Sequence, residues 1–318
     1  MHIERTQRAS NKVPFSLRGK TLSMETTLSL MVAPFVIFIL VLNYLPLLGW
    51  SMAFVDYSPG ISIFNSEFVG FRFFKEALLY TADFPISILN TFAMSMLGIV
   101  FSVVPVILAI LISEIKNDKY RNILQTATSL PNFMSWVIVY SVAFSFFAQD
   151  DGIINTFLMH FNIISTPTNL LGNKDIVWFS QTFFSLWKTA GWTAIIYLGA
   201  IAGIDSELYE AARVDGAGKI KQIIHIMIPG IMPTFVVMLF LQIGWMLGGT
   251  SFEQIYVFHN ALVHDKIMTL DYYTYQMGMK NLNFSQATAM GMFKTIVSIV
   301  LLFISGLASK KLVGRSII

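Results

Sequence analysis

The chain has 318 residues, of which 55% are hydrophobic and only 12% are charged, and its mean hydropathy is positive. Soluble domains carry about 25% charged residues, so this composition excludes that class and places the chain in a lipid bilayer. The absence of cysteine excludes disulfides, thiolate nucleophiles and cysteine-ligated metals. The net charge of +3 needs no nucleic-acid partner, since no basic patch is interleaved with aromatic residues.

Six apolar stretches are each long enough to cross the hydrocarbon core, which needs about 20 apolar residues. We therefore predict an all-α polytopic membrane protein with six transmembrane helices. In this interpretation residues 1–28 form a basic N-terminal segment, too long and polar for a typical secretory signal. Residues 29–308 form the membrane domain and residues 309–318 a C-terminal tail. The predicted spans are 29–50, 86–112, 130–148, 178–203, 224–249 and 288–308.

The distribution of Lys and Arg predicts the orientation. Fourteen of these residues lie in the terminal segments and in the loops after the second and fourth spans, against five in the other loops. By the positive-inside rule, both termini and the loop at residues 205–228 are expected in the cytoplasm. Residues 51–85, 149–177 and 250–287 then face outward. These long outward segments fit either an external partner or a simple cover for the span ends.

The fourth predicted span carries a polar stripe. Ser185, Lys188, Thr189 and Trp192 are spaced i, i+3, i+4 and i+7, so they share one helix face. Charges inside spans are costly and are functional candidates, and a stripe of hydroxyl, cation and indole is suited to a water-filled path. Sugars need such a lining. The competing interpretation is interhelical packing, with Lys188 paired to a carboxylate of another subunit.

Between the fourth and fifth spans, the sequence predicts a short helix, a turn and a second helix. Asp205 can cap the first helix, and Glu207 and Glu210 suit its positive N-terminal end. Gly216 can take the left-handed conformation that ends this helix. The second helix, from about Lys219, leads into the fifth span.

This loop is also a candidate docking site. Ala211 and Ala212 stand side by side, and two small residues let the surface of another protein approach a helix closely. The alternative is an ordinary surface helix-turn-helix between two spans.

The last two spans carry two further features. Pro229 and Pro233 remove backbone donors and predict a bend at the start of the fifth span. Lys294 lies near the outer end of the sixth span, and we interpret it as snorkelling to the interface. No Asp or Glu lies centrally in any predicted span, which argues against an ion-coupled transporter.

Motifs for catalysis and metal binding are missing from the sequence. Gly19-Lys20-Thr21 has Pro14 where a phosphate-binding loop needs glycine, so any ATP is hydrolysed by another chain. His259 and His264 lack the i, i+4 spacing that lets two imidazoles on a helix share a zinc ion. Asp150-Asp151 is interpreted as a turn signal and not as a catalytic pair. We expect no enzyme activity, metal or cofactor in this chain.

The run Glu210-Ala211-Ala212-Arg213-Val214-Asp215-Gly216-Ala217, with Pro229 downstream, resembles the EAA loop of permease subunits in ATP-binding-cassette importers. Other stretches resemble the sugar-type permeases, in particular the oligo- and polysaccharide branch, which includes alginate-type importers. The resemblance spans most of the chain and implies a type I importer permease fold with a cytoplasmic coupling helix between spans four and five. The stretches are residues 68–75, 130–136, 192–199 and 204–209.

The resemblance implies roles for individual residues. The residues of the coupling loop would bind ATPase subunits; they are Glu210, Ala211, Ala212, Asp215 and Gly216. In maltose-type relatives the span before this loop contacts sugar, and counting back from Glu210 gives Ser185, Lys188, Thr189 and Trp192 as the matching positions. In the fifth span, the contacts are expected among Gln242, Trp245, Gly248 and Ser251, and we select Gln242 and Trp245.

The cation at Lys188 departs from the maltose-type pattern, which is apolar at this position. This departure argues against a neutral disaccharide and favours an oligosaccharide that contains uronates.

The resemblance also implies partners in the bacterial inner membrane. We expect a second permease subunit in a heterodimer, two ATPase subunits that bind ATP and Mg²⁺, a solute-binding protein at the outward loops, membrane lipid, and no nucleic acid. A permease for another solute class, a secondary transporter and a non-transporting scaffold remain alternatives. A scaffold would explain six spans and a docking loop, but it would not explain the polar stripe on the fourth span.

Overall fold

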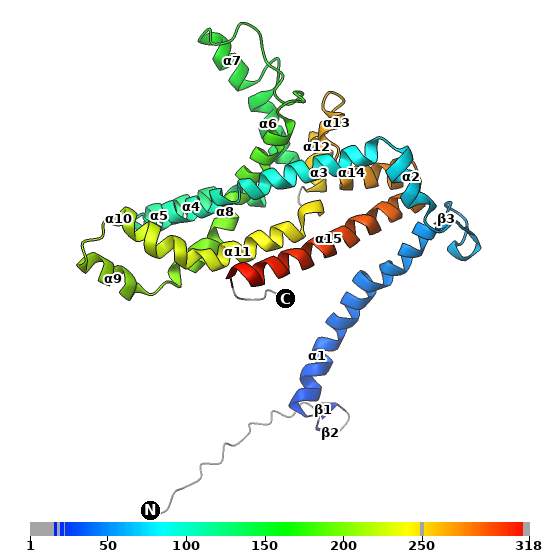
Figure 1. Ribbon diagram of the computed structural model, residues 1–318, viewed down its shortest axis with the longest axis horizontal. Helices are drawn as coiled ribbons and strands as arrows, with labels where there is room; N and C mark the ends of the chain where they lie inside the picture. Colours follow the sequence, from blue (N-terminus) through cyan, green and yellow to red (C-terminus); the bar gives the residue numbers. More distant parts are fainter. Residues whose placement is uncertain (1–15, 18–19, 22, 249–250, 314–318) are drawn as a thin grey trace, which may run out of the picture. The chain divides into compact units, whose positions relative to one another are not determined.

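The computed structural model confirms that the chain is built from helices, with only two short antiparallel strand pairs in its described part (Figure 1). The structure describes residues 16–17, 20–21, 23–248 and 251–313. The chain divides into two units, Met1–Met52 and Ala53–Ile318, and each is described by itself. Most of the predicted N-terminal segment and the last five residues of the predicted C-terminal tail lie outside the described residues.

The first unit contains one long apolar helix. α1 (Met24–Ile39) begins after Ser23, whose hydroxyl accepts a hydrogen bond of 3.2 Å from the Thr26 amide. The helical path continues through the π-helix η1 (Leu40–Tyr44) and the 3₁₀-helix η2 (Leu45–Phe54). None of the α1 side chains is buried in the unit, as expected for a helix that lies in lipid. The strands β1 (Ser16–Leu17) and β2 (Lys20–Thr21) pair before it.

The second unit begins with short elements and continues into two apolar helices. Its first half contains β3 (Val55–Asp56), η3 (Ile63–Asn65), β4 (Glu67–Phe68), α2 (Arg72–Tyr80), α3 (Asp83–Val100), α4 (Val103–Ser113), α5 (Asp118–Ser129), η4 (Leu130–Phe133), α6 (Trp136–Phe147) and α7 (Ile153–His160).

The second half of this unit begins with α8, its longest helix apart from α15. It contains α8 (Val177–Ala202), α9 (Ser206–Val214), α10 (Lys219–Gln222), η5 (Ile223–Met227), α11 (Ile228–Gly244), η6 (Met246–Gly248), α12 (Phe252–Phe258), α13 (His264–Ile267), α14 (Leu270–Tyr275), η7 (Gln276–Lys280) and α15 (Phe284–Val313). The helices α9 and α10 lie at one end of the unit and α2 lies at the other (Figure 1).

Four stretches in the described part of the chain are long and apolar enough to cross a membrane, and they coincide with the first, second, fifth and sixth predicted spans. They are Met24–Phe54, Asp83–Ser113, Lys219–Gly244 and Phe284–Leu307. α8 matches the fourth predicted span, and its 26 residues would extend about 39 Å, but its polar stripe makes it less apolar. The total of six spans remains a prediction.

The third predicted span, residues 130–148, is not one straight helix. The chain bends by 105° between the segments Asp118–Phe133 and Trp136–Phe147. Ser135 has an extended backbone, and its hydroxyl accepts a hydrogen bond of 3.4 Å from the Ile138 amide. Because this side chain starts a new helix, the apolar run that the sequence presents as continuous is broken into two pieces.

α8 is the central helix of the second unit and packs against α3, α4, α5 and α11. It approaches α5 very closely at Gly191, where an added Cβ would lie 2.0 Å from the carbonyl oxygen of Thr128. Only glycine fits at this crossing.

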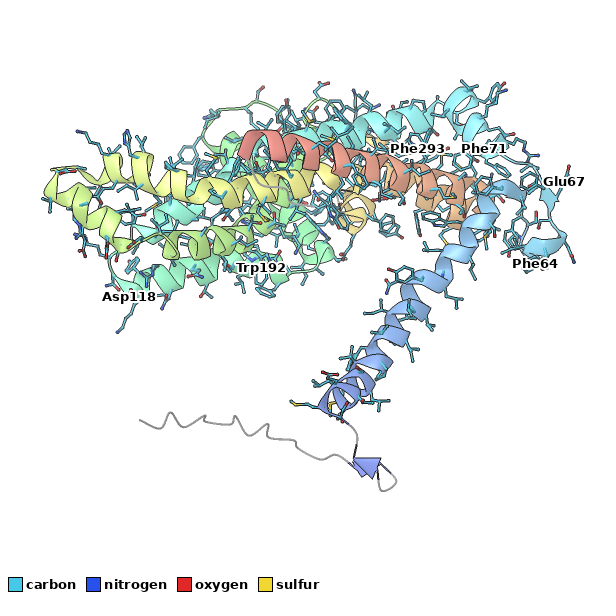
Figure 2. All side chains as sticks on the ribbon, turned by 60° about the horizontal axis from the view of Figure 1, so that its bottom comes forward. Phe64, Glu67, Phe71, Asp118, Trp192 and Phe293 are labelled. Atoms are coloured by element: carbon cyan, nitrogen blue, oxygen red, sulfur yellow. The ribbon has the colours of Figure 1, made fainter. Side chains whose placement is uncertain are left out.

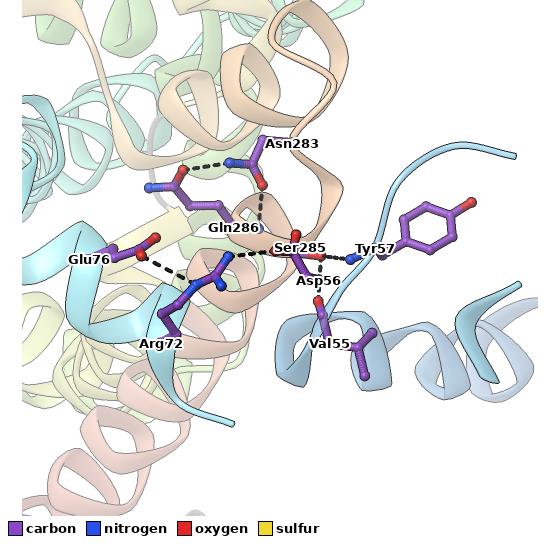
Figure 3. A network of polar contacts seen from close by, with 8 residues as sticks. All are labelled: Val55, Asp56, Tyr57, Arg72, Glu76, Asn283, Ser285 and Gln286. Carbon is purple, nitrogen blue, oxygen red and sulfur yellow. Dashed lines mark hydrogen bonds and ion pairs between the residues drawn. The ribbon is translucent and has the colours of Figure 1, made fainter. Parts of the chain in front are cut away.

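A polar network fixes the start of the second unit to the beginning of α15 (Figure 3). The Ser285 hydroxyl donates to the carbonyl oxygen of Val55 over 2.7 Å and accepts from the Tyr57 amide over 2.9 Å. Arg72 of α2 forms an ion pair of 2.8 Å with Asp56 of β3. These contacts hold β3, α2 and α15 together at one end of the unit.

Candidate functional site

The segment between α8 and α11 has the predicted helix, turn and second helix. The Asp205 carboxylate accepts a hydrogen bond of 3.0 Å from the Glu207 amide and caps α9. Gly216 has a φ of +76°. The amides of Gly216 and Ala217 donate to the carbonyls of Arg213 and Ala212 over 3.1 and 2.8 Å. This pair of bonds is a Schellman motif. As the sequence predicts, α9 ends because Gly216 takes the left-handed conformation.

The residues proposed for ATPase coupling lie at the surface of this segment. Glu210, Ala211, Asp215 and Gly216 are exposed, while Ala212 is half-buried and lines a hollow of about 360 Å³. Their role in binding another protein remains a prediction.

α10 is tied to the bundle and leads directly into the fifth apolar stretch. Lys219 forms an ion pair with Glu114 at the end of α4. The chain then passes through the π-helix η5, in which the Ile228 amide donates to the carbonyl of Ile223, before Pro229 enters α11. A wider helical turn thus precedes the first proline, at the position where the sequence predicts a bend.

A cavity of about 340 Å³ lies among α3, α8, α11, η6 and α12. Four of the six residues predicted to line a substrate path lie in its wall, namely Ser185, Thr189, Gln242 and Trp245. Trp245 is 69% exposed, so its indole offers a broad apolar surface. The other polar side chains of the wall are Ser95, Gln181, Thr182 and Gln254.

A second cavity of about 200 Å³ adjoins the first and shares Leu186, Thr189 and Gln242 with it. It adds Thr193 and Tyr197 of α8 to the lining. We call the two together the polar path. Among the described residues, none of those that line the polar path carries a formal charge. Hydroxyls, amides and one indole therefore make up its hydrogen-bonding and stacking groups.

Lys188 points away from the polar path. Its side chain is buried, and Nζ donates to the carbonyl oxygens of Asn132 over 2.7 Å and Pro131 over 3.4 Å. The ammonium also lies 5.6 Å from the centre of the Trp136 ring. Within this chain the cation is therefore bound at the carbonyl end of η4, where a positive charge is favourable, and its pairing with a carboxylate of another subunit stays a prediction.

Trp192 does not line the polar path either. Its side chain is half-exposed (Figure 2) and meets the ring of Phe133 edge-on at 5.6 Å between ring centres. The structure thus divides the predicted stripe, with Ser185 and Thr189 in the wall of the polar path and Lys188 and Trp192 packed against the bend between α5 and α6.

Two glutamines in the wall were not predicted. Gln254 is fully buried, and its Nε2 donates to the main-chain oxygen of Gln181 over 2.8 Å and to its side-chain oxygen over 3.0 Å. The Oε1 of Gln254 has no hydrogen-bond partner in the described part of the chain. A signal for Gln181 was present, since polar residues recur every four positions on α8, at 181, 185, 189, 193 and 197. Gln254 comes from a segment interpreted as an outward loop.

Lys294, interpreted as a snorkelling residue, has an anionic partner that the sequence did not predict. It is the eleventh residue of α15, and its Nζ forms an ion pair with Asp271 of α14. The two side chains are each 26% exposed. The carboxylate comes from the segment between the fifth and sixth spans, which the predicted membrane boundaries placed outside.

His259 and His264 lie close together although they do not share a helix. The chain turns between α12 and α13, which places Nε2 of His259 2.7 Å from Nδ1 of His264. Burial lowers the pKa of His259, and His264 and Lys280 lower it further. In the part of the chain that the structure describes, no three His, Asp or Glu side chains gather as a metal site.

Residues 102–317 match the family described as "Binding-protein-dependent transport system inner membrane component". The chain is 37% identical over 293 residues to Protein LplB of Bacillus subtilis. The alignment covers 91% of this chain and 90% of that protein. It is also 37% identical over 293 residues to the polygalacturonan/rhamnogalacturonan transport system permease protein YteP of the same organism, over 91% of this chain and 89% of that one.

Among solved structures, the fold is similar to a chain of a bacterial alginate ABC transporter in complex with an alginate pentasaccharide-bound periplasmic protein. The TM-score is 0.83 at 29% identity, over 92% of this chain and 97% of that one. A second structure of a bacterial ABC transporter involved in the import of alginate matches with a TM-score of 0.80 at 31% identity, over 91% and 96% of the two chains.

Proposed function

The chain belongs to the family of inner membrane components of binding-protein-dependent transport systems, and from this premise we propose that it is a permease subunit of an importer for oligo- or polysaccharides, including those that contain uronates. It is not an enzyme. The names of two relatives support the substrate class, since one is a permease for polygalacturonan and rhamnogalacturonan and the other belongs to an alginate transporter.

The observation that carries this proposal is the lining of the polar path. Sugars present hydroxyl groups at their edges and apolar patches on their ring faces. The hydroxyls of Ser185 and Thr189 and the amide of Gln242 can pair with the former, and the exposed indole of Trp245 can stack on the latter. The buried and unpartnered Oε1 of Gln254 adds an acceptor for a sugar hydroxyl.

The energy for transport is supplied, in this proposal, by two partner ATPase subunits that bind ATP and Mg²⁺. They would dock on α9 through Glu210, Ala211, Ala212, Asp215 and Gly216, of which all but Ala212 are exposed. A turn joins α9 to α10, which is tied to α4 by the Lys219–Glu114 ion pair and continues through η5 into α11 and the wall of the polar path. Movement of α9 would thus reach Gln242 through this turn and the helical stretch that follows it.

The remaining assembly follows from the same proposal. The loop with α9 and both termini face the cytoplasm, a second permease subunit completes a heterodimer, and a solute-binding protein docks on the outward segments. A mechanism based on a binding protein fits the description of the family.

Charge reversal at Glu210 tests the function. In the importer reconstituted with its partners, Glu210→Lys should abolish sugar uptake while the subunit still inserts in the membrane. The binding protein should no longer stimulate ATP hydrolysis. Lys119→Glu, a charge reversal on α5, is the matched control and should retain uptake. Unchanged uptake in the Glu210→Lys importer would refute the assignment of the docking site, and absence of sugar uptake in the unaltered importer would refute the substrate class.

A further inference from the structure

A third cavity, of about 550 Å³, lies beside the polar path between α11, α14 and α15. Trp245 and Gly248 line both this cavity and the larger cavity of the polar path, so the two spaces adjoin at this turn of the chain. We call the third space the side cavity. Its other polar residues are Asp271, Lys294, Thr295 and Ser298.

The side cavity differs from the polar path in its charge. Lys294 supplies a cation and Asp271 an anion, whereas in the described part of the chain the walls of the polar path are uncharged. Lys294 lies ten residues after the first residue of α15, about 15 Å along the helix. A charge on a membrane-spanning helix is expensive and is retained where it has a partner or a function.

Lys294 remains open to the cavity although it has a partner. Its side chain is 26% exposed, and Gly248 places no side chain over the ammonium. A Cβ added at Gly248 would lie 3.4 Å from Nζ and 3.5 Å from Cε, so a larger residue there would cover the cation. An ammonium has three hydrogens and the Asp271 oxygen takes one, which leaves donors for a second carboxylate.

We propose that the side cavity is a sugar subsite in which Lys294 binds the carboxylate of a uronate residue. This inference rests on the proposed function and names the residue that recognises acidic sugars. Asp271 holds the ammonium in place when no sugar is present. The indole of Trp245 stacks on the sugar ring, and Thr295 and Ser298 present hydroxyls in the same cavity. Lys188 has no part in this recognition, because its ammonium is bound to η4.

The test compares an acidic sugar with its neutral ester. Uptake of trigalacturonate and of its fully methyl-esterified form is measured in proteoliposomes that contain the complete importer and its binding protein. The double variant Lys294→Gln/Asp271→Asn replaces the ion pair by two neutral amides, so neither partner is left as an unpaired charge in the membrane. Lys119→Gln removes a cation from α5 and is the control.

The double variant should take up trigalacturonate about tenfold more slowly, because a hydrogen bond to a charged group is lost, while uptake of the ester changes less than about twofold. If the binding protein rejects the ester, uptake cannot be compared. Binding of both sugars is then measured directly on the complex, which is trapped with a slowly hydrolysed ATP analogue. An equal loss of uptake for both sugars would show that the ion pair is purely structural. Unchanged uptake of both sugars would show that Lys294 does not recognise the substrate. Each result overturns the proposal. Failure of the unaltered importer to transport or bind either sugar would instead contradict the proposed function.

Discussion

The ammonium of Lys188 lies 2.7 Å from the carbonyl oxygen of Asn132, at the end of the short helix where the chain bends by 105° into α6. A cation buried in an apolar bundle is thus stabilised by carbonyl oxygens at the end of a short helix. The bond fixes α8 to the bend between α5 and α6.

Replacement of Lys188 by Met should therefore weaken the fold and leave substrate selection unchanged. The carbonyl of Asn132 would lose its charged donor, and we expect the free energy of unfolding to fall by about 1–3 kcal/mol. Thermal unfolding of the purified subunit measures this loss, with the exposed Lys119→Met as control. Uptake of acidic and neutral sugars should decrease in the same proportion, and a selective loss of acidic sugar would contradict this assignment.

Gly191→Ala should destabilise the subunit because the new methyl group would lie 2.0 Å from the Thr128 oxygen and force α5 away from α8. We expect a loss of about 1–3 kcal/mol. Gly199→Ala on the same helix is the matched control. No atom lies within 4 Å of a Cβ at that position, so the higher helix propensity of alanine should stabilise by about 0.5–1 kcal/mol. The two variants should shift the melting temperature in opposite directions.

Gly216→Ala should loosen the end of α9. A residue with a Cβ at a φ of +76° is disfavoured by about 1–2 kcal/mol, although the surrounding space is open. Hydrogen exchange at the amides of Gly216 and Ala217, which close the Schellman motif, should become faster. Gly218→Ala provides the comparison, because Gly218 has a φ of −67° and no close neighbour. Equal exchange rates in the two variants would show that the turn does not depend on the left-handed conformation.

The segment with α12 and α13 should open as the pH falls. Burial and the neighbouring His264 and Lys280 lower the pKa of His259 in the folded protein. The unfolded segment therefore binds a proton first, and stability is lost as the pH falls below about 6.5, the ordinary pKa of histidine. Hydrogen exchange across residues 252–275, after correction for the intrinsic slowing of amide exchange at lower pH, should accelerate between pH 8 and pH 5.5.

In His259→Gln this acceleration should be much smaller, because the titrating imidazole is absent. His225→Gln removes an imidazole from the other end of the unit and should keep the acceleration of the unaltered protein. An unchanged response in His259→Gln would assign the effect to other groups.

The helix cap, the turn and the start of the second helix around α9 were predictable because each depends on neighbours in sequence. Asp205 caps two residues ahead of it, and Gly216 ends the helix through its own backbone freedom. The interruption of the third span was missed since hydropathy does not register a cap such as Ser135 inside an apolar run.

The lining of the polar path was predictable only in part. Helical periodicity groups Lys188 with Ser185 and Thr189, but adjacent sectors of one helix face different neighbours in a bundle. The carbonyls that receive Lys188 exist because η4 ends beside α8, and sequence spacing on α8 carries no information about that end. The same limit applies to Lys294, whose partner Asp271 stands 23 positions away on a segment taken to be outside the membrane.

The uncharged walls of the polar path have an electrical consequence. An elementary charge that crosses the membrane field changes the free energy by about 2.3 kcal/mol per 100 mV. The described residues in these walls carry no formal charge, so these side chains themselves contribute no gating charge. The membrane voltage therefore exerts little force on these side chains. In the proposed importer, the work of opening the path would be transmitted mechanically through the continuous helical stretch from α10 through η5 to Gln242.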